Sequence, residues 1–256
     1  MGPTSPERVR CDRAAGRVLG KMKRACTRWS LLPPGSAVAI GVSGGTDSFA
    51  LTWLAARYNR TIRPRCRFVG IHVALDASGE TGGLPKRVED WCAELGLPVE
   101  TVAPRFDAGQ PVPETCFACA HIRRRTLLEA ANERGCDRVA LGHHSDDVVE
   151  TWLMTLMYTG TPDALPPIRQ YFGGAITVVR PLYELRKAEL MRMARLCGFP
   201  EPVDTCPNRA QTARDRVRTA LRQLGRDERD VRRHLFWAAV RSLERDRVNE
   251  GTKDPE

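Results

Sequence analysis

Residues 43–48 carry side chains that suit a phosphate-binding loop between a buried strand (36–42) and a helix (47–59). Adjacent glycines let backbone amides approach an anion without Cβ clashes, and a helix N-terminus adds positive potential. Serine hydroxyls can donate to phosphate, and the carboxylate at position 47 fits if Mg²⁺ bridges it to the phosphates. The predicted ligand-binding residues are Ser43, Gly44, Gly45, Thr46, Asp47 and Ser48.

A second loop, Leu141-Gly142-His143-His144-Ser145-Asp146-Asp147, follows the predicted strand 137–142 and opens the helix 145–158. Carboxyl ends of parallel strands face one crevice, so this loop can share a site with residues 43–48. We expect Gly142 and His143 to contact the ligand, and Asp146 or Asp147 to position the metal or nucleotide. With Asp47, these two carboxylates are the candidate catalytic residues. The alternative is that they only cap the helix.

Three cysteines form a candidate metal site. Cys116 and Cys119 make a CxxC pair where a helix begins, and this spacing brings two sulfurs within reach of one metal. A redox pair or a structural zinc is also conceivable, but the sequence has no second CxxC. Cys206, beside a proline, is the best third ligand. Three thiolates suit a 4Fe-4S cluster that keeps one iron open to an exogenous ligand.

The other six cysteines carry no predicted chemistry. A chain of this size in a reducing compartment does not need disulfides to fold. We expect buried apolar positions for one set: Cys66, Cys92, Cys136 and Cys197. We assign no role to the two on the N-terminal helix, Cys11 and Cys26.

The elements that position these groups alternate along the chain. Short apolar runs predict five strands at 36–42, 66–75, 97–103, 137–142 and 175–182. Helical patterns separate most of them, which favours an α/β fold with a parallel five-stranded sheet flanked by helices. Helical extensions precede and follow this part. We divide the chain into a basic helix (1–32), an α/β domain (33–200) and an Arg-rich helical segment that begins with the third cysteine (201–256).

Charge points to an anionic partner. The 256 residues carry a net charge of +9, and residues 209–248 hold twelve Arg against six acidic residues. Arginine suits nucleic-acid phosphates, although a solvated helix face with i,i+4 ion pairs would show a similar pattern. No apolar run is long enough to span a bilayer, and the N-terminus is charged where a secretory signal is apolar. We therefore expect a cytoplasmic protein with no membrane partner.

SGGTDS and LGHHSDDVVET resemble the two signatures of the PP-loop ATP pyrophosphatases, over residues 36–182. The resemblance implies an adenine nucleotide α-hydrolase-like sheet and cleavage of ATP between its α and β phosphates, with adenylation of a carbonyl oxygen on the substrate. The succession of CFACAHIRRR, LGHHSDDVVET, VVRPLYELRK and DTCPN is similar to the tRNA 2-thiocytidine synthetase group. That similarity implies Mg²⁺-dependent thiolation of tRNA, giving 2-thiocytidine at position 32. It also implies a 4Fe-4S cluster on Cys116, Cys119 and Cys206, a homodimer, and a cysteine desulfurase as sulfur donor.

The family usually carries lysine where Thr46 stands. We therefore expect the cation for the ATP phosphates to come from an Arg or Lys elsewhere in the chain. Two related activities are alternatives, namely tRNA 2-thiouridine synthesis and a lysidine synthetase-type modification. An alternative of another class is a non-catalytic protein that binds ATP or RNA or senses a cluster.

Overall fold

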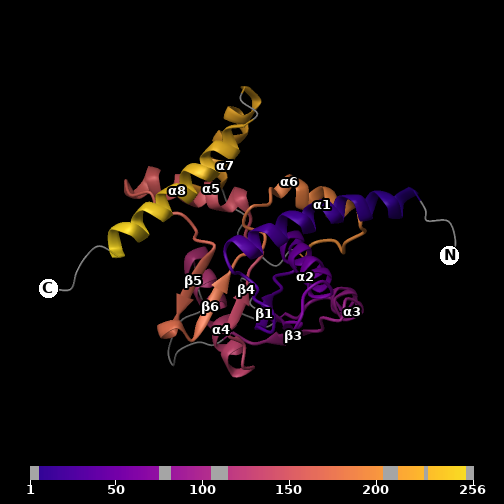
Figure 1. The fold of residues 1–256 in the computed structure, drawn as a ribbon. Coiled ribbons are helices and arrows are strands. Elements are labelled where there is room, and N and C mark those ends of the chain that lie inside the picture. Colours follow the sequence, from indigo (N-terminus) through magenta and orange to yellow (C-terminus); the bar gives the residue numbers. More distant parts are fainter. Residues whose placement is uncertain (1–5, 75–81, 105–114, 204–212, 228–229, 252–256) are drawn as a thin grey trace.

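The computed structural model describes residues 6–74, 82–104, 115–203, 213–227 and 230–251, which form a sheet with helices on both faces (Figure 1). The strands are β1 (Ala37–Gly41), β2 (Arg67–Val73), β3 (Val99–Val102), β4 (Arg138–Ala140), β5 (Ile168–Tyr171) and β6 (Ile176–Val179). The helices are α1 (Pro6–Arg28), α2 (Thr46–Asn59), α3 (Lys86–Glu94), α4 (Cys116–Glu133), α5 (Ser145–Thr159), α6 (Lys187–Leu196), α7 (Ala213–Asp227) and α8 (Val231–Gly251), with a 3-10 turn η1 (Phe172–Gly174).

The strand order in the described sheet is β3-β2-β1-β4-β6-β5. Strands β1 to β4 and β6 pair in parallel, as predicted, whereas β5 pairs antiparallel with β6. The predicted count of five strands was one too low, because only the ends of β5 are partly covered and its two middle residues are exposed. It therefore lacks the apolar run of a buried strand. Strand order reverses at β1, so a crevice is expected outside the carboxyl ends of β1 and β4.

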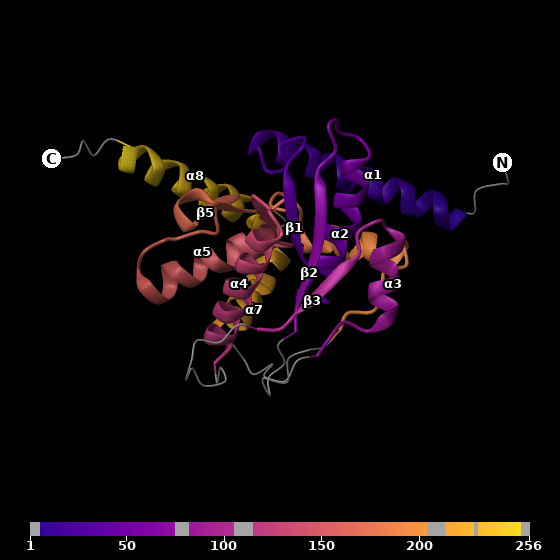
Figure 2. The same ribbon diagram turned by 90° about the horizontal axis from the view of Figure 1, so that it is seen from below.

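The central strand shows how the two faces are built. In β1, Val38 and Ile40 point to one face and contribute to a core with α1, α2 and α6. Between them, Ala39 points to the other face, where Leu127 and Leu128 of α4 cover the sheet. This alternation follows from the two-residue period of a strand. Figure 2 shows α3 beside β3 at one side of the molecule and α5 with α8 at the opposite side.

A third core joins α5 to the C-terminal helices. Val148 and Val149 of α5 cluster with Val217 of α7 and with Phe236 and Ala239 of α8. Such helices occur where the Arg-rich segment predicts them, although each ends three to four residues later than expected. The division of the chain at residues 32 and 200 stays a prediction. Within the described ranges, no helix has both the length and the apolar character that crossing a bilayer requires.

The cysteines outside the candidate cluster are mostly core residues. Cys66, Cys92 and Cys136 are buried, as predicted. Cys197 is a correction, because its sulfur forms a disulfide with Cys11 and so ties α1 to the end of α6. The two residues are 186 positions apart, and only the packing of α1 along α6 brings their Cα atoms within 5.0 Å.

Candidate active site

The loop between β1 and α2 has the geometry predicted for phosphate binding. Gly44 adopts φ +83°, a conformation that side-chain-bearing residues rarely adopt, and α2 begins two residues later. The Ser48 hydroxyl is buried and donates to the carbonyl of Gly45 at 2.8 Å, so it holds the loop shape. Ser43 is exposed. The first N–H groups of α2 have no intrahelical acceptor and can bind an anion.

The two predicted loops meet backbone to backbone. A Cβ on Gly142 would lie 3.0 Å from both the carbonyl carbon and the oxygen of Asp47, and 3.2 Å from the amide nitrogen of Ser48. A side chain at this position would be crowded, because the contacts are tighter than most Cβ contacts and the Asp47 backbone would have to shift by a few tenths of an ångström. Gly142, which we predicted to contact the ligand, therefore also lets the two loops pack closely against each other.

Asp47 lies at the junction of the two loops. Its Oδ2 pairs with Lys187 Nζ at 2.5 Å, and its Oδ1 lies 3.7 Å from Nε2 of the buried His144. That Oδ1 is itself buried and accepts no hydrogen bond within the described part of the chain. An unsatisfied carboxylate oxygen beside a phosphate-binding loop suits Mg²⁺, which is commonly held by one or two carboxylates together with substrate phosphates.

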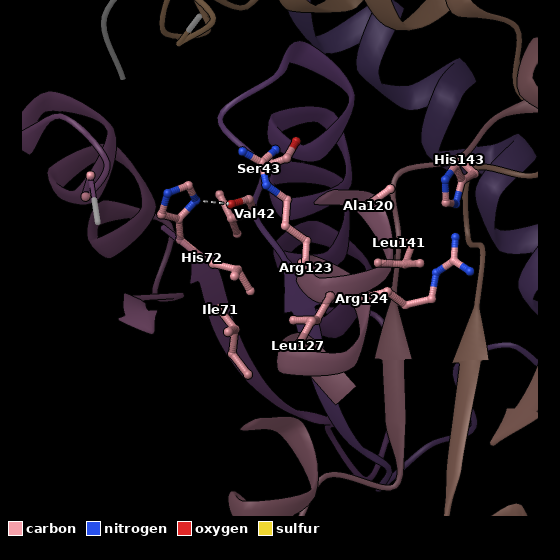
Figure 3. A pocket seen from close by; sticks show the side chains of 14 residues that line it. Val42, Ser43, Ile71, His72, Ala120, Arg123, Arg124, Leu127, Leu141 and His143 are labelled. Carbon is pink, nitrogen blue, oxygen red and sulfur yellow. Dashed lines mark hydrogen bonds between the residues drawn. The ribbon is translucent and has the colours of Figure 1, made fainter. Parts of the chain in front are cut away.

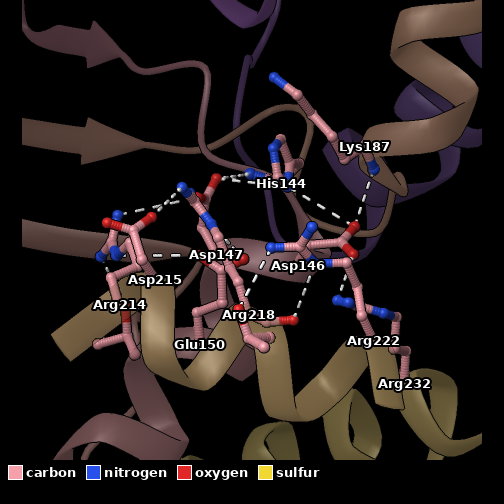
Figure 4. A network of polar contacts seen from close by, with 12 residues as sticks. His144, Asp146, Asp147, Glu150, Lys187, Arg214, Asp215, Arg218, Arg222 and Arg232 are labelled. Atoms are coloured by element: carbon pink, nitrogen blue, oxygen red, sulfur yellow. Dashed lines mark hydrogen bonds and ion pairs between the residues drawn. The ribbon is translucent and has the colours of Figure 1, made fainter. Parts of the chain in front are cut away.

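Asp146 and Asp147 both bind groups of the chain itself (Figure 4). Asp147 Oδ2 accepts the backbone N–H of His144 at 3.0 Å and so caps α5. Asp146 Oδ2 accepts the backbone N–H of Lys187 at 2.8 Å, and its Oδ1 accepts Arg232 of α8 at 2.9 Å. For Asp147, these contacts match the alternative that it caps the helix. Asp146 links α5 to α6 and α8. Direct catalytic roles for the two carboxylates stay predictions.

The charge network continues along α5. Glu150 is buried and accepts Arg218 of α7 at 2.9 Å, while Arg214 lies 3.8 Å from its other oxygen. This hydrogen bond raises the pKa of Arg218. Burial opposes ionisation of Asp147, but the neighbouring His144 side chain, the hydrogen bond from the His144 backbone and the charge of Arg214 outweigh it, and the pKa of Asp147 lies below its ordinary value. Part of the Arg-rich segment therefore holds α7 and α8 against α5.

A pocket of about 560 Å³ opens beside the loops, between the ends of β1 and β2 and helix α4. Ser43 and His143 line it, and α4 contributes Arg123 and Arg124. In Figure 3, Arg123 extends toward Ser43, and Arg124 extends toward His143. The pocket thus combines apolar walls with cations directed at both loops, which suits a nucleotide or an RNA phosphate.

The buried Arg180, directly after β6, adds a further cation behind His143. Its Nη1 donates to the carbonyl of Pro166, and burial lowers its pKa to about 10, so it stays charged at neutral pH. Burial, followed by the charge of Arg180, lowers the pKa of His143 to about 4. His143 is therefore neutral at pH 7.

This shift makes stability depend on pH. Because the pKa of His143 is about 4 in the folded chain and 6.5 when unperturbed, the unfolded chain binds more protons between these values. We expect the free energy of unfolding to fall by about 2–3 kcal/mol as the pH drops from 7.5 to 4.5. Asp147 adds to this only at lower pH, below the ordinary carboxyl pKa of 3.8.

In urea unfolding experiments, the free energy of unfolding of His143→Asn should no longer show this dependence on pH. The same change at exposed His234 should keep it, and equal slopes in wild type and His143→Asn would contradict the assignment.

The predicted cluster cysteines are only partly described. Cys116 is the first residue of α4, and Cys119 is a half-buried free thiol next to Ala120, which lines the pocket. Cys206 lies outside the described residues. The last described residue before it is Val203, whose backbone N–H donates to the carbonyl of Gly44 at 2.9 Å. Within the described part, no three His, Cys, Asp or Glu side chains form a metal-binding group.

Sequence reasoning missed three residues of this site: His144, Arg180 and Lys187. All three follow a strand or open a helix at the carboxyl edge of the sheet. Arg180 ends the apolar run of β6, and a charge at that place is a usable signal for a site residue. For His144 and Lys187 no such signal exists, because their roles depend on contacts with Asp47, 140 positions before Lys187.

Comparison with known proteins agrees with this geometry. A model of the PP-loop domain matches residues 18–224. The computed structure is similar to that of the U34-tRNA thiolase NcsA from Methanococcus maripaludis, solved with its 4Fe-4S cluster, with a TM-score of 0.71 and 22% identity over 91% of this chain and 80% of that one. The fold and the paired loops define a PP-loop protein.

Curated relatives show to which family of PP-loop proteins the chain belongs. A tRNA-cytidine(32) 2-sulfurtransferase of Anaeromyxobacter dehalogenans (strain 2CP-C) is 33% identical over 87% of this chain and 78% of its own length. One from Citrifermentans bemidjiense is 30% identical over 89% of this chain and 91% of its length. The chain belongs to the PP-loop family and, within it, to the family of the tRNA-cytidine(32) 2-sulfurtransferases.

Proposed function

We propose that this chain is an ATP-dependent tRNA sulfurtransferase that converts cytidine 32 of tRNA to 2-thiocytidine. The observation that carries this proposal is the 33% identity with a tRNA-cytidine(32) 2-sulfurtransferase over most of both chains. The meeting of the two loops at Gly142 supports it, because it builds one site from both motifs.

ATP binds with its phosphates on residues 43–48, against the N-terminus of α2. Asp47 would hold Mg²⁺, and its unsatisfied Oδ1 is the candidate ligand atom. The α-phosphate then faces the pocket, through which the base of the tRNA can reach it. Arg123, Arg124 and His143 line the pocket at this point.

Thiolation proceeds in two steps. The C2 oxygen of cytosine attacks the α-phosphorus, the bond to the bridging oxygen breaks, and pyrophosphate leaves. Hydrosulfide then adds to C2, the carbon–oxygen bond breaks, AMP leaves with the oxygen, and one proton is released. Activation is needed because a pyrimidine carbonyl oxygen is a poor leaving group. The proton passes to solvent, because His143 with a pKa of about 4 is too weak a base to hold it at neutral pH.

The cysteines fit an iron-sulfur cluster. CxxC begins α4 beside the pocket, and the chain that leads to Cys206 is hydrogen-bonded to the phosphate loop at Gly44. We therefore assign Cys116, Cys119 and Cys206 as the ligands. A 4Fe-4S cluster with three protein thiolates would supply an open iron site for sulfide.

The outward arginines of α7 contact tRNA in this proposal. Arg216 and Arg222 are exposed, unlike Arg214 and Arg218, which pair with α5. Replacing both exposed residues with alanine should weaken tRNA binding by about 10-fold and lower the slope of log affinity against log salt by about 2. Filter binding at several salt concentrations measures both.

A matched pair of exposed arginines provides the control. Arg60 and Arg65 lie beyond the C-terminal end of α2, near the amino ends of the strands, whereas the two loops lie at the carboxyl ends. The Arg60→Ala/Arg65→Ala variant should bind tRNA like the wild type. An equal loss in both double variants would mean that the effect reflects net charge and not a binding face.

Two partners and the compartment complete the proposal. A cysteine desulfurase supplies the sulfur in the cytoplasm, as the resemblance implies. Two copies form a homodimer, for which exposed apolar side chains at the end of α5 offer a surface: Leu156, Met157 and Tyr158.

Nucleoside mass spectrometry of tRNA tests the function. Reconstituted protein, Mg-ATP, sulfide and unmodified tRNA should yield pyrophosphate and 2-thiocytidine. If 2-thiouridine forms and 2-thiocytidine does not, the proposed target base is wrong but the proposed thiolation chemistry stands. Incorporation of lysine into tRNA would indicate lysidine synthesis. Absence of pyrophosphate would favour a binding or sensing protein.

A further inference from the structure

The phosphate loop of this chain contains no basic residue. Residues 43–48 supply hydroxyls, backbone amides and one carboxylate, but a triphosphate carries several negative charges. Backbone amides and Mg²⁺ offset part of this charge, and nucleotide sites usually add a lysine or arginine. A cation from another element is therefore expected at the loop.

We infer that Lys187, the first residue of α6, provides this cation and binds the β- and γ-phosphates of ATP. The inference rests on the proposed use of ATP. Its Nζ lies 2.5 Å from Oδ2 of Asp47, the residue next to Thr46 in the first turn of α2. Lysine thus reaches the loop through space, although the sequence places it 140 residues away.

The backbone of Lys187 is fixed, while its side chain is accessible. The backbone N–H donates to Asp146, and the side chain extends away from that carboxylate (Figure 4). The side chain is 40% exposed, and the ammonium has three donors, one of which points to Asp47. The other two can face an anion that binds on the loop.

Magnesium binding would shift the balance of this ion pair. When Asp47 coordinates Mg²⁺, its negative charge is shared with the metal, and its hold on Lys187 weakens. Lys187 would then be able to turn toward phosphates bound on the loop. Arg123 is the competing candidate, but it enters from the pocket wall toward Ser43, at the other end of the loop (Figure 3).

The affinities of Lys187→Met for three ligands test the inference. We expect Mg-ATP and Mg-pyrophosphate to bind about 10- to 100-fold more weakly than to the wild type, the effect of losing a charge-assisted hydrogen bond. AMP should bind within about 2-fold of the wild type, because it lacks the β- and γ-phosphates. If AMP weakens equally, Lys187 only holds the loop in shape, and the inference fails.

A second test restores a positive charge inside the phosphate loop, residues 43–48. Thr46→Lys in the Lys187→Met background should recover most of the Mg-ATP affinity. Lys21→Met is the matched control, because Lys21 also pairs with a carboxylate, that of Glu189 in α6, and is 41% exposed. That variant should bind Mg-ATP normally.

Two further results would overturn the inference: no loss of affinity in Lys187→Met, or a loss in Arg123→Met alone. These measurements need no tRNA. A wild type that binds Mg-ATP through Lys187 but makes no 2-thiocytidine would therefore disprove the proposed function and leave this inference intact.

Discussion

Cys119→Ser should abolish tRNA thiolation while Mg-ATP still binds. Serine keeps the size of the side chain at the start of α4, but a hydroxyl is a poor ligand for iron compared with a thiolate. We expect the rate of 2-thiocytidine formation to fall by about 1,000-fold or more, and the affinity for Mg-ATP to change by less than about 3-fold. Iron content after reconstitution and nucleoside mass spectrometry measure the two effects.

A cysteine beyond the other end of α4 gives the control. Cys136 is buried in the core under this helix, away from the pocket, so Cys136→Ala should keep both iron and thiolation. Normal thiolation by Cys119→Ser would remove the cysteine cluster from the mechanism. Loss of Mg-ATP binding in the same variant would instead show that Cys119 supports the fold of the pocket.

Gly142→Ala should separate the two loops of the site. Its Cβ would lie 3.0 Å from the carbonyl group of Asp47, and backbone on both sides leaves no flexible side chain to yield. We expect the free energy of unfolding to drop by about 1–3 kcal/mol and Mg-ATP affinity to fall by up to about 100-fold. Urea unfolding and nucleotide titration check these values.

Gly16→Ala is the matched substitution. Gly16 lies inside α1, and a Cβ there would meet nothing within 4 Å. Alanine should therefore stabilise the helix by up to about 1 kcal/mol and leave Mg-ATP affinity unchanged. Unchanged affinity and stability in Gly142→Ala would mean that the loops do not depend on their close contact.

Local patterns carried much of the prediction. The apolar run at β1 is continuous, and those at β2 and β4 are mostly apolar, because central parallel strands are covered on both faces, so they are visible without any tertiary knowledge. The loop at residues 43–48 was equally clear, since its glycines and the following helix lie together in the chain. Strand β5 was missed because it is an edge strand with an exposed middle.

The sequence by itself determined the alternation of the parallel strands with helices and the two loops at the carboxyl edge, because each depends on neighbouring residues. Only the tertiary structure decided which charges serve which purpose. Asp146 binds the backbone of Lys187, the side chain of Lys187 reaches Asp47, and Cys11 joins Cys197. These pairings form where helices pack, between residues that no local pattern connects.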